Sequence, residues 1–207
     1  GLDRIAMTPT DTQIVEAYLR NGYRIVVWDA ISDSKGPREE GWPDKTYIRD
    51  DYTPGDRVGL KTGVDIGGAS EHAAQVRKYL ADIDFDWTPG ARMAAMLLPP
   101  TNFAYGRASK PLSHMFYTTE IALVSRRFED IDKSALFELR GTKNNGDVGL
   151  QSMAPPSVWS KNGTREPLVF VHAGDPAHVF SADLTRKLIH FAIAQILAKH
   201  LGVNGFG

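Results

Sequence analysis

Acidic residues occupy every second position from 82 to 86 in the segment 79–87, which reads YLADIDFDW and places Asp82, Asp84 and Asp86 in alternation with apolar residues. In a β-strand these carboxylates would project from one face, about 6–7 Å apart, while the residues between them enter the core. Like charges held that close raise each other's pKa or require a cation. Hard carboxylate oxygens favour Mg²⁺ or Mn²⁺ over zinc. The segment therefore predicts a divalent-metal site, with a solvated turn after a short strand as the simpler alternative.

A group of phosphate-compatible donors follows within eight residues: Arg107, Ser109, Lys110, Ser113 and His114. Arginine offers a planar fork of donors to a phosphate, and lysine offers a point charge. Taken singly, the cations are typical of a solvated loop and the histidine of a satisfied core residue. Grouped after an acidic strand, they predict a clamp for a triphosphate opposite the metal ligands.

A third acidic position lies in the segment 135–141, ALFELRG. Its alternation places Glu138 and Arg140 on one face of a strand and the apolar residues on the other. An ordinary exposed ion pair explains this segment by itself, so a third carboxylate for the metal is the less economical interpretation at this point. Further along, Pro155-Pro156-Ser157 turns the chain sharply, and Asn162-Gly163 indicates a hairpin.

The flanking elements that must position these residues are indicated by periodicity and caps. Thr10 and Gln13 form a capping box for a helix that ends at Asn21-Gly22, and Ser181 is expected to cap a final helix over 183–201. A short helix is expected over 89–98, weaker helical character over 69–79, and a long loop over 29–54. Strands are expected at 24–28, 57–63, 79–85, 114–119, 135–140, 149–154 and 168–172. A helix followed by many strands with intervening helices predicts an α+β fold.

Composition limits the classes of function. The chain has 207 residues, 42% of them hydrophobic, and 24 basic against 25 acidic residues give a net charge of −1. A uniformly basic nucleic-acid coat is thereby excluded, so any anion site is a local patch. The absence of cysteine excludes disulfides and thiolate metal sites. No apolar run approaches a membrane span and no signal-peptide pattern is present, which predicts a soluble cytoplasmic protein without membrane contact.

The order of five segments resembles one family. These segments are GLKTG at 59–63, DID at 82–84, GRASKPLSH at 106–114, ELRG at 138–141 and APPS at 154–157. Together they resemble the primase–polymerase (Prim-Pol) domain of the archaeo-eukaryotic primase superfamily, found in replication proteins of plasmids, phages and mobile elements. The resemblance covers about residues 12–200. Asp82 and Asp84 match the first family motif, His114 the second and Glu138 the third. The chain departs from the family in two places, with Glu where Asp is frequent and with Ser113 directly before the histidine rather than two residues before it.

The resemblance implies a fold in which an α/β N-terminal part packs on an RRM-like catalytic sheet, with the active site in the cleft between them. Residues 1–207 would be one Prim-Pol domain excised from a longer primase–helicase protein. The implied activity is that of a DNA primase and DNA polymerase, a nucleotidyl transferase that joins (d)NTPs to a 3′-hydroxyl, with a single-stranded DNA template and a primer as partners. The helicase domain would belong to the same full-length chain.

The family also implies roles for individual residues. Asp82, Asp84 and Glu138 would hold two Mg²⁺ or Mn²⁺ ions. A second group would bind the nucleotide or lie beside the ligands: His114, Arg107, Lys110, Ser113, Arg140 and Ser157.

Two other functions remain open at this stage. A metal-dependent phosphodiesterase or nuclease also needs clustered carboxylates and a histidine, but it uses water as the nucleophile. A non-catalytic nucleic-acid-binding module serving a helicase is the second alternative, which the acidic residues at all three family positions argue against. Grip on DNA would depend on local patches such as Arg126-Arg127, Lys143 and 161–165, and on stacking by aromatic residues. Candidates for stacking are Trp28, Trp42, Tyr105 and Trp159.

Overall fold

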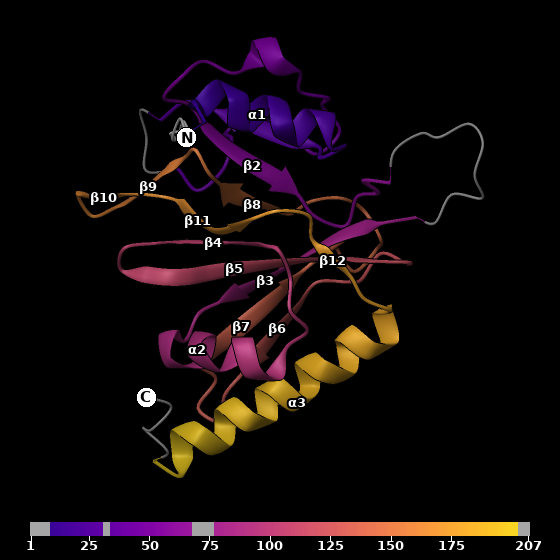
Figure 1. Ribbon diagram of the computed structural model, residues 1–207, viewed down its shortest axis with the longest axis vertical. Coiled ribbons are helices and arrows are strands. Elements are labelled where there is room, and N and C mark those ends of the chain that lie inside the picture. Colours follow the sequence, from indigo (N-terminus) through magenta and orange to yellow (C-terminus); the bar gives the residue numbers. More distant parts are fainter. Residues whose placement is uncertain (1–8, 31–33, 68–76, 203–207) are drawn as a thin grey trace, which may run out of the picture.

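A computed structural model describes residues 9–30, 34–67 and 77–202. The chain is α+β, as expected, with antiparallel sheets and helices on their outer faces (Figure 1). The helices are α1 (Asp11–Arg20), a 3-10 turn (Arg49–Asp51), α2 (Thr88–Leu97) and α3 (Ser181–His200). The strands are β1 (Ile25–Trp28), β2 (Arg57–Lys61), β3 (Tyr79–Phe85), β4 (Phe103–Arg107), β5 (Lys110–Thr119), β6 (Arg126–Glu129), β7 (Ala135–Arg140), β8 (Gln151–Ala154), β9 (Val158–Lys161), β10 (Thr164–Pro167), β11 (Val169–Ala173) and β12 (Ala177–His178).

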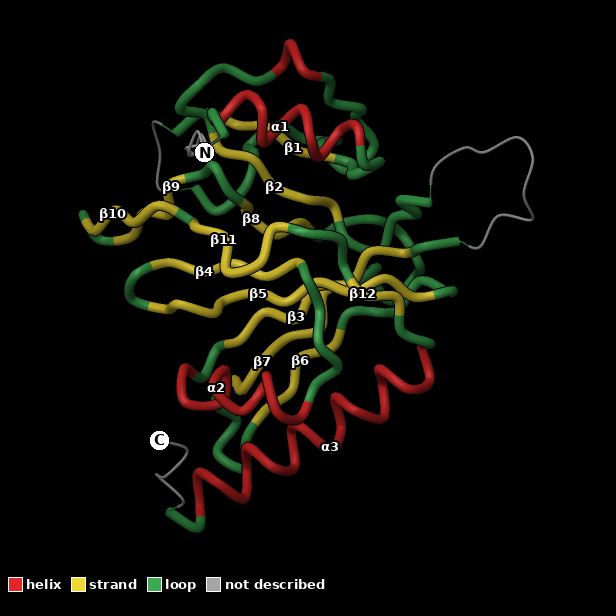
Figure 2. Tube along the Cα trace, viewed as in Figure 1, coloured by secondary structure: helices red, strands yellow, loops and turns green. Residues whose placement is uncertain are grey.

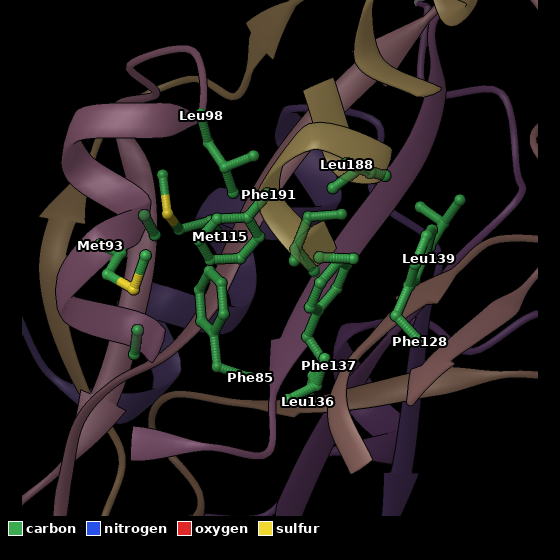
Figure 3. Packing of buried hydrophobic residues seen from close by; sticks show 14 of the residues in the cluster. Phe85, Met93, Leu98, Met115, Phe128, Leu136, Phe137, Leu139, Leu188 and Phe191 are labelled. Carbon is green, nitrogen blue, oxygen red and sulfur yellow. The ribbon is translucent and has the colours of Figure 1, made fainter. Parts of the chain in front are cut away.

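The larger sheet has seven strands in the order β11-β4-β5-β3-β7-β6, with β12 beside β5 (Figure 2). Both α2 and α3 cover one face of it. Alternate residues of β3 point to this face, where Ile83 and Phe85 are fully buried. Phe85 meets Phe191 of α3 edge to face, with ring centroids 5.9 Å apart (Figure 3). The predicted division of β3 into an apolar face and an acidic face is therefore confirmed for its apolar side.

The smaller sheet has three strands in the order β1-β2-β8 and lies with α1 at the other end of the molecule from α3 (Figure 1). A second core joins it to the face of the larger sheet that α2 and α3 leave free, with Leu60 on one side and Phe116 on the other. The hydroxyl of Tyr18 in α1 donates to the Pro155 carbonyl at 2.8 Å. The second sheet and α1 are thus packed across the polar face of β3, and this packing encloses the candidate site.

The capping box at Thr10 and Gln13 is confirmed, but the expected cap of the last helix is wrong. α3 begins at Ser181 itself, after Phe180. The Ser181 backbone N–H and hydroxyl donate to the Glu120 carboxylate at 2.8 and 2.5 Å. A carboxylate from another segment therefore supplies the negative charge that a helix N-terminus prefers.

Several strands differ from the expected ranges. β4 was not expected, and β5 begins at Lys110 instead of His114. The sequence pattern did not indicate this earlier start, because Pro111 interrupts the alternation that is typical of a strand. β6 and β12 were not expected either, whereas the β9–β10 hairpin around Asn162-Gly163 is confirmed. The helical character expected over 69–79 falls largely outside the described residues, and β3 already begins at Tyr79. Among the helices of the described ranges, none has both the length and the apolar character needed to cross a membrane.

Asp130 fastens the end of α3 to the larger sheet, and this contact predicts a pH dependence of stability. It lies 2.6 Å from the Lys199 ammonium and 2.8 Å from His200 Nε2. Its contact with Lys199, followed by that with His200, lowers the pKa of Asp130 from 3.8 to about 2. A lowered folded-state pKa contributes stability above the usual pKa that is lost as the pH falls through the lowered value. We expect Asp130→Asn to be less stable than the wild type at neutral pH, with a difference that narrows between about pH 4 and pH 2. Urea melts over this pH range measure it, and a constant difference would contradict it.

Candidate active site between the two sheets

A cavity of about 530 Å³ lies between the acidic face of the larger sheet and the strands β8 and β9. Its walls come from segments far apart in the chain. The lining residues are Lys35, Asp84, Asp86, Thr88, Arg107, Ser109, Lys110, His114, Glu138, Arg140, Leu150, Gln151, Met153, Trp159, Lys161 and Leu168. Most of the residues selected from the sequence are therefore gathered around one opening.

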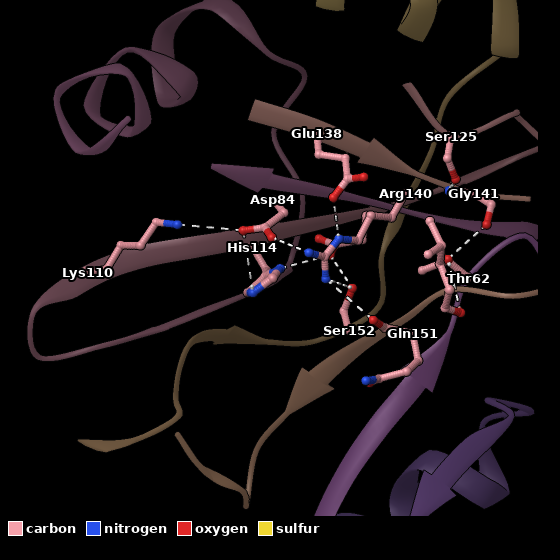
Figure 4. Close-up of polar contacts among 12 residues, drawn as sticks. Thr62, Asp84, Lys110, His114, Ser125, Glu138, Arg140, Gly141, Gln151 and Ser152 are labelled. Carbon is pink, nitrogen blue, oxygen red and sulfur yellow. Dashed lines mark hydrogen bonds and ion pairs between the residues drawn. The ribbon is translucent and has the colours of Figure 1, made fainter. Parts of the chain in front are cut away.

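Three of them lie at one level on neighbouring strands. Asp84 of β3 pairs with His114 of β5 on one side and with Glu138 of β7 on the other. Directly paired residues of antiparallel strands point to the same face, with Cβ atoms about 5 Å apart. Figure 4 shows the three side chains projecting together toward the cavity. Register thus brings together two acidic residues and a histidine from segments separated by more than twenty residues in the chain.

Arg140 lies between the two carboxylates (Figure 4). Its Nη2 is 2.6 Å from Asp84 Oδ2, and its Nε is 2.9 Å from Glu138 Oε2. Burial would lower the pKa of Arg140, but the charges of Asp84, Asp82 and Glu138 outweigh it, so the net shift is upward. The guanidinium therefore stays charged and neutralises the pair of carboxylates.

Asp84 has a lysine and a histidine beside it. The Lys110 ammonium is 3.6 Å from its Oδ1, and His114 Nε2 is 3.8 Å away. Burial raises the pKa of Asp84, but the charges of His114, Arg140 and Lys110 together outweigh burial and hold the pKa below its usual value. Asp84 is thus an ionised carboxylate that organises three donors suited to phosphate.

Asp82 does not reach the cavity. Its side chain is fully buried, and Oδ2 accepts hydrogen bonds from His114 Nδ1 at 2.8 Å and from the Ser152 hydroxyl at 2.5 Å. The other oxygen, Oδ1, has no hydrogen-bond partner among the described residues. Because Asp82 accepts from Nδ1, the His114 ring presents Nε2 to the cavity.

Asp86 follows the end of β3 and lines the cavity, so it shares the opening with Asp84 rather than the strand face with Asp82. Burial, and then the charge of Asp84, raise the pKa of Asp86. Asp86 and Asp84 thus have pKa values shifted in opposite directions within one cavity.

The carboxylates of the cavity suit a divalent ion by their chemistry rather than by their present arrangement. Among the described residues, no three acidic or histidine side chains are arranged to hold one. Asp84 and Glu138 offer hard oxygens that suit Mg²⁺ or Mn²⁺, whereas Asp82, predicted as a third ligand, is fully buried and does not line the cavity. The donor chemistry fits, provided that Arg140 releases at least one of the two carboxylates that it now bridges.

The β4–β5 hairpin forms a rigid wall of the cavity. The Arg107 guanidinium lies 4.1 Å from the Trp159 ring centroid, and its Nε is 3.0 Å from Glu166. The Ser109 N–H donates to the same carboxylate at 2.9 Å. Gly106 lies at an irregularity of this hairpin, where a Cβ would stand 2.2 Å from the Pro111 carbonyl oxygen. Only glycine fits there, and the irregularity aims Arg107 at Trp159.

Besides Asp82, two predicted site residues are not brought to the cavity. Ser113 is 1% exposed, and its hydroxyl donates to the Lys110 carbonyl. As the neighbour of His114 in a strand it points to the opposite face, which the alternation of β5 already indicated. Ser157 is also 1% exposed, and its hydroxyl is hydrogen-bonded to both the N–H and the carbonyl of Val58. Both serines therefore have a structural role, since their hydroxyls bind backbone groups of the fold rather than a ligand.

The motifs did not indicate three residues that lie opposite the acidic face. Ser152 and Gln151 belong to β8 of the second sheet, where Ser152 binds Asp82 and Gln151 lines the cavity, and Lys35 lines the cavity from the loop after β1. These residues carry no motif of their own, and only their place opposite β3 and β7 gives them a role. Trp159, considered from the sequence as a stacking residue, does line the cavity, whereas Tyr105 is fully buried beneath the His114 ring.

No model of a known protein family matches the chain, and no curated protein sequence matches it. Its function is therefore argued from the geometry of the cavity and from the motifs quoted above.

Proposed function

We propose that this protein is a template-directed nucleotidyl transferase, a DNA primase and polymerase of the Prim-Pol type that acts in the replication of a plasmid, phage or mobile element. The observation that carries the proposal is the alignment of Asp84, His114 and Glu138 at one level of three neighbouring strands, facing a cavity rimmed by Lys110 and Arg107. A metal-bound nucleoside triphosphate requires clustered carboxylates for the metal and several hydrogen-bond donors for the phosphate oxygens.

The architecture supports the same proposal. The strands β4, β5, β3 and β7 are neighbours in one antiparallel sheet with α2 and α3 on one face. This arrangement is compatible with an RRM-like catalytic sheet. The smaller sheet and α1 would then be the N-terminal part, and the cavity between the sheets would be the cleft that receives nucleotide, primer and single-stranded DNA template.

Different residues around the cavity would bind the metal ion and the triphosphate. When bound, Mg²⁺ or Mn²⁺ makes the primer 3′-hydroxyl a better nucleophile and neutralises charge on the departing pyrophosphate. Asp84 and Glu138, which line the cavity, are the residues that would hold it, whereas Asp82 lies behind the cavity wall and holds His114. Lys110, Arg107 and Arg140 would bind the triphosphate oxygens as charged donors. Trp159 carries Arg107 on its ring and limits where that guanidinium can move.

Asp82 and His114 act as a pair in this proposal. Asp82 accepts from Nδ1 and thereby sets the orientation of the ring, so that Nε2 can donate to a phosphate oxygen when the imidazole is protonated. Asp82 is therefore a positioning residue for His114.

A direct assay tests the function. The protein is incubated with a single-stranded DNA template, with each nucleotide pool and with either metal ion, in the presence and absence of primer. Extension of the primer, or products formed without it, supports the proposal. Cleavage of labelled DNA without added nucleotide, together with no nucleotide addition under any condition, would overturn it in favour of the metal-dependent phosphodiesterase. Binding of DNA with neither reaction would favour the non-catalytic module.

His114→Ala is expected to weaken dNTP binding about 10- to 100-fold, because a hydrogen bond to a charged group contributes about 1.5–3 kcal/mol. Equilibrium titration with a fluorescent dNTP measures it. His190→Ala, at an exposed position of α3, is the matched control and should bind as the wild type does. Equal affinity of the His114 variant and the wild type would remove His114 from the nucleotide site.

A further inference from the structure

A second cavity, of about 680 Å³, lies between the start of β1 and the segments 43–47 and 143–148. None of its residues belongs to the candidate active site. Its lining brings together four cationic side chains and two tyrosine rings: Arg24, Lys45, Lys61, Lys143, Tyr23 and Tyr47.

Lys61 is a cation on the floor of this cavity. The residue is 3% exposed, and its ammonium donates to the carbonyls of Pro43 and Lys45, each at 2.7 Å. Both acceptors are neutral, and so is the ring of Tyr47, whose centroid is 5.8 Å from the ammonium. No carboxylate of the described residues therefore pairs with this charge at contact distance. Burial, and then the charge of Arg24, lower the pKa of Lys61, with Asp44 acting in the opposite direction. An anion in the cavity would relieve this cost of burial.

The rim of the cavity is also positive. Arg24, Lys45 and Lys143 are exposed, and the two carboxylates that share the lining are those of Asp44 and Asp147. In the described part of the chain, the ion pairs do not include Arg24, Lys61 or Lys143. Three cations of this cavity are thus left without a partner carboxylate at contact distance, on a protein whose total charge is close to zero.

The second cavity adjoins the candidate active site through the segment 147–151. Asp147 and Val148 line the second cavity, whereas Leu150 and Gln151 line the first. Val148 and Leu150 are two residues apart, at most about 7 Å along the chain. The Lys143 side chain lies against Gly149, in the segment between the two cavities. A Cβ at position 149 would stand 1.8 Å from Lys143 Cε. Glycine at 149 is therefore what lets the lysine stem lie against the segment that separates the two cavities.

We propose that this second cavity binds a phosphate of the nucleic-acid strand whose reacting end lies in the active-site cavity. The identity of that strand rests on the proposed function, whereas the affinity for a phosphate rests on the cations themselves. Arg24, Lys61 and Lys143 neutralise the phosphate, and the segment 147–151 carries the strand from one cavity to the other. Such contacts bind any sequence and fix the position of a strand relative to the site of chemistry.

The test uses the exposed cations, whose replacement leaves the core intact. Arg24→Gln/Lys143→Gln is compared with the wild type and with Lys187→Gln, an exposed lysine of α3 that lines neither cavity. Binding of a fluorescein-labelled single-stranded thymidine oligonucleotide is measured by anisotropy over a series of NaCl concentrations. A fluorescent dNTP is titrated in parallel, and unlabelled inorganic phosphate serves as a competitor in both titrations.

The expected result is a weaker oligonucleotide affinity for the double variant, by about fivefold per lost contact near 0.1 M salt. The slope of log affinity against log salt should become shallower by about 0.7 per contact, with dNTP affinity unchanged. An unchanged slope and affinity would overturn the proposal, and so would a loss confined to the dNTP. Wild-type protein that binds the oligonucleotide through this cavity but adds no nucleotide would overturn the proposed function alone.

Discussion

Asp84→Asn is expected to lower the rate of nucleotide addition about a thousandfold. Asp84 is the carboxylate around which the site is organised, since Arg140, Lys110 and His114 all lie within 4 Å of it. An amide keeps the shape of the side chain but removes its charge and one metal-binding oxygen. Charge stabilisation by a metal ion in the transition state contributes several kcal/mol, and each 1.4 kcal/mol corresponds to about a tenfold change in rate. Single-turnover primer extension at saturating dNTP measures this effect.

The control separates chemistry from folding. Asp183→Asn removes an exposed carboxylate on α3 whose recorded ion pair is with Arg186, three residues away. It should extend primers at the wild-type rate. The thermal midpoint of Asp84→Asn should show that the variant is folded under the conditions of the assay. If the folded variant extends primers within about threefold of the wild type, Asp84 is not part of the reaction centre.

Arg140→Met is expected to give the largest loss of stability, about 3 kcal/mol in the free energy of unfolding. The arginine is the cation between Asp84 and Glu138, and it also contacts Gln151 and Ser152 of the second sheet. The side chains of Asp84 and Glu138 are only 15% and 31% exposed, so removing the guanidinium leaves two poorly solvated charges uncompensated. For a chain of this size the loss corresponds to a thermal midpoint lower by roughly 6–12 °C. Urea and thermal melts measure both quantities.

The same variant tests whether the carboxylates accept a divalent ion. Without the guanidinium, Asp84 and Glu138 face each other directly, so Mg²⁺ or Mn²⁺ should raise the thermal midpoint of Arg140→Met more than that of the wild type. Arg186→Met, which removes an exposed arginine of α3, should change neither the stability nor the response to metal appreciably. Equal metal responses of Arg140→Met and the wild type would mean that these carboxylates do not share an ion.

The direction of each side chain was largely predictable from the sequence, because it is a local property. The period of two in β3 places Ile83 and Phe85 in the core, and the same period in β7 sets Glu138 and Arg140 on one face. The capping box at Thr10 was likewise predictable, because it depends on residues within one stretch of four, from Thr10 to Gln13. The prediction that Ser113 binds nucleotide was wrong, because the alternation of β5 already places Ser113 on the face opposite His114.

Register and packing between sheets could be decided only in three dimensions. A period of two determines which face a residue takes but not which residue it meets on the next strand, since register depends on turns and on the fit of the core. That Asp84 lies between His114 and Glu138, that Arg140 occupies the space between the carboxylates, and that Asp82 lies beneath His114 follow from that register. The basic cavity around Lys61 arises in the same way, from loops that no motif connects. Sequence determined the chemistry available on each strand, and tertiary packing decided which charges meet, because contact distances depend on the whole core rather than on any one segment.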